Sequence, residues 1–268
     1  MRTALTIAGS DSGGGAGIQA DLKTFAAFGV YGTSAITALT AQNTVAVTAL
    51  RVAPPDMVVA QIDAVVSDLG CDAVKTGMLA AAAIVEAVAE ALTRLRLPHL
   101  VVDPVMVSKS GDHLLAEDAV AALRQRLLPL ARVVTPNIPE AEVLTGITIT
   151  TLDDAIRAAQ AIRAMGARAV IVKGGHLDRP DIVDVLIDGD GGDLVVQLVS
   201  PRVSGVHTHG TGCTFAAAIT ARLALGDDLE AAARAAQAYV AGAMRAGVPL
   251  GQGHRPLDHQ WATRSGSL

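Results

Sequence analysis

Aromatic residues, basic charge and long apolar runs are all scarce in this chain of 268 residues. Phe, Trp and Tyr supply 2% of the residues, and the formal net charge is -5. A nucleic-acid-binding surface needs stacking side chains and a basic stripe, so we expect no nucleic acid partner. Although 51% of the residues are hydrophobic, no run approaches the roughly eighteen apolar residues of a membrane span. We therefore expect a soluble protein with no membrane partner.

Cysteine is also scarce, because only Cys71 and Cys213 occur, far apart and outside any Cys-x-x-Cys pair. This spacing suggests neither a disulfide framework nor a zinc site, and it fits a reducing compartment best. The first apolar stretch, residues 4–8, is too short for a secretory signal peptide and soon reaches an acidic residue. We expect a cytoplasmic protein in which Cys71 is a small, buried core residue.

Short β-branched runs alternate with longer helical patterns along the chain. The runs that predict buried strands are 5–8, 34–39, 73–75, 100–103, 132–135 and 169–173. The predicted helices are 17–28, 55–69, 80–95, 117–128, 152–165, 212–225 and 229–246. This alternation indicates an α/β fold with a mainly parallel sheet and helices on both faces. No linker, composition shift or internal repeat divides the chain, so we expect one domain over residues 1–268.

Two segments interrupt this alternation. One is residues 45–52. In the other, the runs 182–188 and 194–199 are joined by Gly-Asp-Gly-Gly, whose residues supply the positive φ angles of a hairpin turn. The hairpin predicts antiparallel strands at one edge of the sheet.

Polar residues follow nearly every predicted strand. Ligands of open α/β sheets bind beyond the carboxyl ends of the strands, so these residues are the candidates for a site. They are Gly-Ser-Asp at 9–11, Thr-Ala-Gln-Asn at 40–43, Lys-Thr-Gly-Met at 75–78, Asp-Pro-Val-Met at 103–106, Thr-Pro-Asn at 135–137 and Lys-Gly-Gly-His at 173–176. A purely structural protein has no need of polar groups at one end of its strands, and the pattern therefore predicts a functional edge.

The first glycine-rich loop, residues 9–21, contains Gly-Ala-Gly-Ile-Gln-Ala, which satisfies the relaxed dinucleotide pattern G-x-G-x-x-A. That pattern also requires an acidic residue about twenty positions further on. Residues 22–55 contain no Asp or Glu, and the loop lacks the Gly-Lys-Ser/Thr of common nucleotide phosphate loops. A dinucleotide-dependent oxidoreductase is therefore disfavoured, and a tight strand-to-helix turn stays open as the plain interpretation.

The second glycine cluster, residues 207–214, runs directly into a predicted helix. Unpaired N–H groups at a helix start, exposed by glycines and reinforced by the helix dipole, form an anion site that would stabilise a transferred phosphoryl group. Cys213 lies in the first turn, where the same field is expected to lower the thiol pKa. The alternative is a small, buried core cysteine.

Eight sequence strings, in order, carry a family resemblance. They are GSDSGGGAGIQADLKTF at 9–25, ALTAQNT at 38–44, KTGML at 75–79, VDPVM at 102–106, SKSG at 108–111, TPNIPEA at 135–141, KGGH at 173–176 and HGTGCT at 209–214. In this order and spacing they resemble the hydroxymethylpyrimidine/phosphomethylpyrimidine kinases of thiamine biosynthesis. The resemblance implies the ribokinase-like fold, a three-layer α/β sandwich with a mainly parallel central sheet and an antiparallel edge.

The resemblance also implies an activity: transfer of the γ-phosphoryl group of ATP to the hydroxymethyl oxygen of an aminopyrimidine, and then to the phosphate so formed. Gly210, Thr211 and Gly212 would form the anion hole, with Cys213 closest to the acceptor oxygen. Sugar kinases of this superfamily have an aspartate base at the position of Cys213, so cysteine there marks the pyrimidine branch. A thiolate is an effective base only when its pKa lies near the working pH.

Four polar residues are the candidates for the ATP and Mg²⁺ sites. Asn137 and Glu140 match the N-x-x-E signature by which the superfamily organises Mg²⁺ beside the ATP phosphates. Asp103 is a second acidic candidate for the metal, and Lys173 is the expected cation on the ATP phosphates. Mg²⁺ suits such a site because it keeps several waters and takes few carboxylates. Helix capping by Asn137 and Glu140 is an alternative interpretation, and both can hold.

Gln42 is the strongest candidate for recognising the aminopyrimidine, because a carboxamide offers a donor and an acceptor side by side. The resemblance adds apolar contacts from Met78 and Val105 and places Asp21 near the substrate. The plain alternative for Asp21 is a carboxylate favoured by a helix dipole. Residues 107–113 resemble a flap that closes over the site, with an ordinary surface loop as the alternative.

Two further interpretations stay open beside the pyrimidine kinase. A pyridoxal or pyridoxine kinase is the nearest, since some members of this branch phosphorylate both ring systems. A catalytically silent nucleotide-binding protein is disfavoured because Cys213, Asn137, Glu140 and Lys173 are all present. The resemblance also implies a homodimer.

Overall fold

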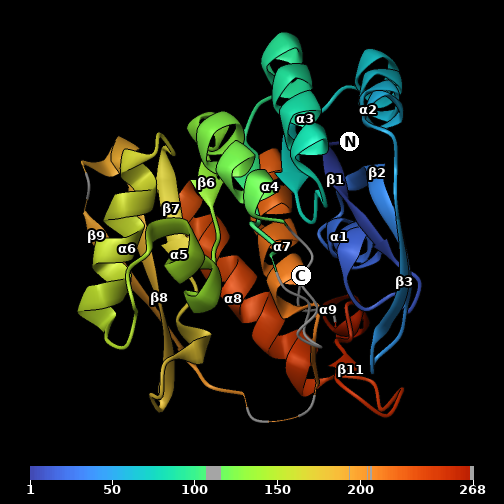
Figure 1. Cartoon of the computed structure of the whole chain (residues 1–268). Coiled ribbons are helices and arrows are strands. Elements are labelled where there is room, and N and C mark those ends of the chain that lie inside the picture. Colours follow the sequence, from blue (N-terminus) through green and yellow to red (C-terminus); the bar gives the residue numbers. More distant parts are fainter. Residues whose placement is uncertain (107–115, 193, 204, 206, 266–268) are drawn as a thin grey trace.

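A large sheet organises the computed structural model, which describes the chain except for residues 107–115, 193, 204, 206 and 266–268 (Figure 1). Within the described residues it has nine strands in the order β3-β2-β1-β4-β5-β6-β7-β8-β9. Their bounds are β1 Thr3–Asp11, β2 Tyr31–Gln42, β3 Val47–Val52, β4 Ala73–Thr76, β5 Leu100–Val102, β6 Val133–Val134, β7 Ala169–Val172, β8 Asp181–Asp188 and β9 Val195–Pro201. The six strands predicted from β-branched runs are all present.

Parallel pairing runs through the middle of the sheet, from β2 across β1, β4, β5 and β6 to β7. The predicted hairpin is confirmed, because β8 and β9 pair antiparallel and β8 also runs antiparallel to β7. The sequence indicated one antiparallel edge, whereas the structure has two. At the second edge the chain after β2 turns back within a few residues, and β3 pairs antiparallel with β2.

Helices cover both faces of the sheet, so the predicted three-layer α/β architecture is confirmed (Figure 1). One face carries α1 (Gly17–Ala27), α7 (Thr211–Leu225) and α8 (Leu229–Arg245). The other carries α2 (Pro55–Leu69), α3 (Ala82–Leu95), α4 (Glu117–Ala122), α5 (Ile138–Thr145) and α6 (Leu152–Ala164). No helix of the described residues is both long and apolar enough to cross a membrane.

Alternate residues of the central strands pack into different cores. In β7, Val170 and Val172 belong to the core beneath α2 to α6, while Ala169 and Ile171 belong to the core beneath α7 and α8. Successive side chains of a strand point to opposite faces of a sheet. A strand that is covered on both faces therefore needs apolar residues at every position, which explains the continuous runs in the sequence.

Three differences from the expected elements are local. The helix predicted for 117–128 is α4 followed by a π-helical turn, Leu123–Leu127, and a 3-10 turn, Leu128–Leu130, where Pro129 cannot continue an α-helix. The helix α5 was anticipated only as a capping alternative. Near the C-terminus, β11 (Arg255–Pro256) pairs with β10 (His207–His209), and the short helix α9 (Trp261–Ser265) follows.

Candidate active site

The start of α7 lies against the carboxyl ends of the parallel strands. Gly210 is its N-cap and has φ 85°, a left-handed conformation that favours glycine. A Cβ at Gly210 would lie 1.9 Å from the carbonyl oxygen of Gly15, so only glycine lets the two glycine-rich loops meet. Thr211, Gly212 and Cys213 form the first turn, whose N–H groups have no acceptor within the helix. This turn therefore presents the N–H groups that the anion site expected from the sequence requires.

Lys173 and Asp103 lie beside that first turn. Lys173 Nζ is 3.1 Å from Asp103 Oδ1, and a Cβ at Gly212 would lie 3.3 Å from Lys173 Nζ and 4.0 Å from Asp103 Oδ2. Burial lowers the pKa of Lys173, but the carboxylates of Asp103 and Glu140 raise it more, so the net direction is upward. The structure therefore places a charged ammonium next to the predicted anion hole.

Asn137 and Glu140 form a capping box at the start of α5. The backbone N–H of Glu140 donates to Asn137 Oδ1 (2.9 Å), and the backbone N–H of Asn137 donates to Glu140 Oε2 (2.8 Å). The capping interpretation is thus confirmed. The Glu140 carboxylate also acts on Lys173, as the raised pKa of that lysine indicates, so α5 starts close to the Lys173 end of the site.

The donor set around Asp103 fits a divalent cation that keeps most of its water. Asp103 is 2% exposed, and its Oδ2 has no hydrogen-bond partner among the described residues. No cluster of three or more His, Cys, Asp or Glu side chains suited to a metal occurs in the described part of the chain. Mg²⁺ needs no such cluster, because one or two carboxylates, phosphate oxygens and water complete its shell. An unpartnered, buried carboxylate oxygen beside a lysine is compatible with that chemistry.

The pKa of the Cys213 thiol is shifted in the direction opposite to that expected from the helix start. It is partly buried, and burial raises its pKa to about 11. Lys75 is the strongest opposing influence, while Asp103 and Asp21 add to the rise. The expectation of a lowered thiol pKa is therefore wrong. The helix start was the correct local signal, but the cost of desolvating a thiolate outweighs it here.

Asp21 and Lys75 form a fully buried ion pair whose charges act on Cys213. Lys75 Nζ lies 2.8 Å from Asp21 Oδ2, which also accepts a hydrogen bond from Thr6 Oγ1 at 2.7 Å. Asp21 Oδ1 is buried and lacks a partner among the described residues. Burial lowers the pKa of Lys75, but Asp21, Cys213 and Asp103 raise it above its ordinary value. Lys75 was among the strand-end candidates, but no role and no pairing with Asp21 was expected for it.

The expected substrate residues lie along the ends of β2, β4 and β5. Gln42 is partly exposed at the end of β2, and its side-chain amide nitrogen makes no hydrogen bond within the described residues. Met78 is 8% exposed and fills the space that Gly9 leaves open. Val105 is partly buried, and its N–H donates to the Asp103 carbonyl oxygen at 2.8 Å. No contact among the described residues joins Gln42 to Cys213 directly.

In the opening loop, residues 9–21, the backbone N–H groups are bound by the side-chain carboxylate of Asp11. The Asp11 carboxylate accepts hydrogen bonds from the backbone N–H groups of Gly13, Gly15 and Ala16 at 2.8, 3.1 and 2.8 Å. It also accepts one from His209 Nε2 at 2.8 Å. Because Asp11 occupies these amides, the loop is not a phosphate cradle. Asp11 was a strand-end candidate and His209 lies in the second glycine cluster, but neither was given a role and their contact was not expected. An aspartate that leads into a glycine run is a known turn signal.

The C-terminal segment supports α7 from the other side. Thr214 Oγ1 and His259 Nε2 lie 2.9 Å apart, and the Tyr239 hydroxyl donates to the His259 carbonyl oxygen at 2.6 Å. Burial lowers the pKa of His259 to about 4, so the ring is neutral near pH 7 and can accept the threonine proton. The residues of the expected flap, 107–113, lie outside the described residues.

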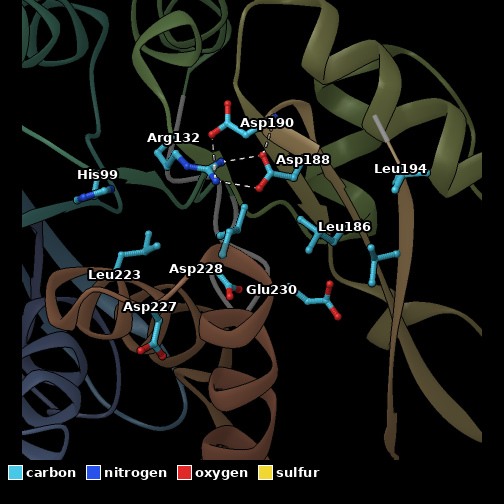
Figure 2. Close-up of a pocket in the computed structure, with 12 residues that line it drawn as sticks. His99, Arg132, Leu186, Asp188, Asp190, Leu194, Leu223, Asp227, Asp228 and Glu230 are labelled. Atoms are coloured by element: carbon cyan, nitrogen blue, oxygen red, sulfur yellow. Dashed lines mark hydrogen bonds and ion pairs between the residues drawn. The ribbon is translucent and has the colours of Figure 1, made fainter. Parts of the chain in front are cut away.

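A cavity of about 400 Å³ lies away from all these residues, at the opposite end of the parallel strands (Figure 2). His99 and Arg132, which precede β5 and β6, line it together with Asp188 and the start of α8. The Arg132 guanidinium donates to both carboxylate oxygens of Asp188, at 3.0 and 2.8 Å. None of the expected site residues lines this cavity.

The chain matches a known protein family over a range that includes the start of α7. The family profile described as phosphomethylpyrimidine kinase matches residues 11–258. The chain belongs to this family. The match covers every expected site residue, including the anion hole and Gln42, and the resemblance stated from the sequence is confirmed.

Individual relatives are similar to nearly the whole of this chain. The chain is 52% identical over 258 residues to the hydroxymethylpyrimidine/phosphomethylpyrimidine kinase of Streptomyces coelicolor, covering 96% of this chain and 94% of that one. It is 52% identical over 255 residues to the thiamine biosynthesis bifunctional protein ThiED of Geobacter sulfurreducens, covering 95% of this chain but only 51% of that longer protein.

The solved structures include a pyridoxal kinase of Bacillus subtilis in complex with ADP. It has a TM-score of 0.90 to this chain and 40% sequence identity, and the match covers 98% of this chain and 99% of that one. The α/β fold expected from the sequence is therefore confirmed, and nucleotide binding is seen in a related kinase of the same fold.

Proposed function

We propose that this chain is an ATP-dependent kinase that phosphorylates 4-amino-5-hydroxymethyl-2-methylpyrimidine and then its monophosphate, in thiamine biosynthesis. The observation that carries this proposal is the 52% identity, over nearly the whole chain, to a relative named for both activities. The site supports it, since a helix start suited to anions, a partly buried lysine and a carboxylate oxygen without a partner among the described residues meet at one edge of the sheet.

The first turn of α7 and Lys173 do the main work in this mechanism. The acceptor oxygen forms a bond to the γ-phosphorus while the bond from that phosphorus to the β–γ bridging oxygen breaks, and ADP leaves. Negative charge on the transferred group is stabilised by the N–H groups of residues 211–213 and by Lys173. Because these groups are already held in place, little reorganisation is needed during transfer.

Asp103, whose buried Oδ2 lacks a partner among the described residues, and Glu140 would hold Mg²⁺. When bound, the ion neutralises phosphate charge. Asn137 keeps Glu140 in position through the capping box, so that capping and metal binding use the same two residues.

Cys213 acts on the proton of the acceptor oxygen in the first step. With a pKa of about 11, its thiolate fraction at pH 7 is on the order of one in 10⁴. In a loose transition state the proton leaves late, when the acceptor oxygen has become acidic, so no preformed thiolate is needed. The thiol can then receive that proton while passing its own to a phosphoryl oxygen. In the second step the acceptor is already an anionic phosphate and needs less help.

Pyridoxal phosphorylation is the second candidate activity. It is supported by the TM-score of 0.90 to a pyridoxal kinase, although the identity to that protein, 40%, is lower than to the pyrimidine kinase. Gln42 favours the aminopyrimidine, because its amide can donate to a ring nitrogen while its carbonyl accepts from the exocyclic amine.

The choice of acceptor is tested by measuring kcat/KM with MgATP for the pyrimidine alcohol, its monophosphate and pyridoxal. We expect the two pyrimidines to be preferred, and Gln42→Ala to lose that preference while the KM for ATP is unchanged. Gln61→Ala is the matched control, because the Gln61 side chain bonds only to backbone groups of β2 and α2. A higher kcat/KM for pyridoxal in the unmodified chain would contradict the proposal.

A single domain, a homodimer and a cytoplasmic location stay predictions. Light scattering of the purified chain over a range of concentrations tests the homodimer prediction. A monomer at all concentrations would show that the homodimer prediction is wrong.

A further inference from the structure

The two glycine-rich loops of the site are tied together by one buried side-chain contact. His209 Nε2, at the end of β10, lies 2.8 Å from Asp11 Oδ2, at the end of β1. Their side chains are 8% and 2% exposed. The pKa of Asp11 is lowered: its burial acts in the opposite direction, but His209 and the loop amides outweigh it. Since an ionised carboxylate only accepts hydrogen bonds, Nε2 must carry the proton in this contact.

His209 directly precedes the anion hole. The next residue, Gly210, is the N-cap of α7, and Gly210 touches the Gly15 carbonyl so closely that any side chain would collide with it. The His209 ring packs on Gly15 in the same way, since a Cβ at Gly15 would lie 2.3 Å from the ring. A shift of His209 therefore moves the amides that would receive the phosphoryl group.

Asp11 leads to the other end of the site. The next residue, Ser12, donates to the Gln42 carbonyl oxygen at 2.8 Å and accepts from the Gln42 N–H at 2.7 Å. The backbone of Gln42 is thus hydrogen-bonded to the opening loop, and the Asp11 carboxylate fixes the conformation of that loop. The Asp11–His209 contact therefore joins the loop that is hydrogen-bonded to the backbone of Gln42 to the helix start of the candidate anion hole.

We propose that Asp11 and His209 are positioning residues that set the distance between the aminopyrimidine held at Gln42 and the phosphoryl group held at residues 210–213. This inference rests on the proposed function. Neither residue touches the substrate in this account, and each acts through the loop that follows it. Correct spacing is a large part of phosphoryl-transfer catalysis, so the pair should govern kcat more than substrate binding.

The test compares two replacements of His209. Leu removes the donor and Gln keeps an N–H near the position of Nε2. We expect His209→Leu to lower kcat for the first phosphorylation by about 10²-fold while the KM values for the pyrimidine and MgATP change less than about threefold. We expect His209→Gln to recover most of the lost kcat. His209→Asn keeps a polar side chain that is too short to reach Asp11, and it should match His209→Leu.

Arg132→Leu is the control, because it breaks a carboxylate contact of similar length at the opposite end of the sheet. We expect it to lower thermal stability without changing kcat. The positioning role is overturned if His209→Leu and His209→Asn keep kcat within about twofold, or if His209→Gln is no better than they are. Failure of the proposed function is a different result, in which the unmodified chain makes no phosphorylated pyrimidine.

Discussion

Lys75 Nζ lies 2.8 Å from Asp21 Oδ2, and neither side chain has any exposed surface. The pair joins β4 to α1, and both of its charges act on the thiol of Cys213. Buried ion pairs are costly to desolvate and give little net stability relative to an apolar pair. The action of this pair on the Cys213 thiol suggests that the chain keeps it for the charge that Lys75 provides there.

Removing one partner of this pair should destabilise the fold strongly. We expect Lys75→Met to lower the free energy of unfolding by about 3–5 kcal/mol, because Asp21 is left buried without its partner. Urea denaturation measures the change. Adding Asp21→Leu to Lys75→Met should recover part of the loss, since the buried charge is then gone.

The matched control is Arg94→Met. Arg94 and Asp63 are 2.7 Å apart, but both are about half exposed. Exposed pairs contribute less than about 1 kcal/mol. A loss of similar size for Lys75→Met and Arg94→Met would show that the buried pair has no special weight.

The Cys213 thiol should resist alkylation at neutral pH. Its raised pKa, about 11, means that only a small fraction of the thiol is ionised at neutral pH and that this fraction rises steadily until the pH approaches 11. We expect the rate of modification by iodoacetamide, read by peptide mass spectrometry, to rise about tenfold per pH unit from 7 to 9.5 without a plateau. A plateau near pH 7 to 8 would mean that the helix start does lower the pKa.

The two phosphorylation steps should respond differently to loss of the thiol. We expect Cys213→Ala to slow the first step by about 10²-fold, a typical contribution of proton-transfer assistance. The second step should slow by less than about tenfold, because its acceptor oxygen carries no proton that must be removed. Single-turnover assays started from the alcohol and from the monophosphate separate the two steps. Equal losses of rate in the two steps would show that Cys213 does not assist the first step more than the second.

Glu140 and Asp154 allow capping to be separated from metal binding. Both complete capping boxes, Glu140 with Asn137 in α5 and Asp154 with Thr151 in α6. Glutamine also completes a capping box, so Glu140→Gln should leave the fold stable and raise the Mg²⁺ concentration for half-maximal rate about tenfold. Asp154→Asn should leave that concentration unchanged. The metal role is contradicted if Glu140→Gln shows the same Mg²⁺ titration as the unmodified chain.

Periodicity carried the prediction of most elements, because strands covered on both faces and amphipathic helices leave strong patterns. It did not reveal α5, whose eight residues are too short for a clear pattern, or the π-helical turn after α4. The antiparallel pairing of β3 depends on a turn whose sequence has no strong hairpin signal.

The helix start of the candidate anion site was predictable because a glycine cluster precedes a long helix. Its environment was not, since burial set the pKa of Cys213 in the opposite direction from the helix start. The Asp11–His209 contact joins residues 198 positions apart, and no local pattern reports such a pair. Contacts between loops that are distant in the chain therefore had to come from the structure.

The central claim is tested most directly by incubating the purified chain with MgATP and 4-amino-5-hydroxymethyl-2-methylpyrimidine and following the products by mass over time. The account predicts that the monophosphate appears first and is then converted to the diphosphate, with two ADP released per diphosphate formed. If the reaction yields no diphosphate while the chain remains folded, the account is contradicted.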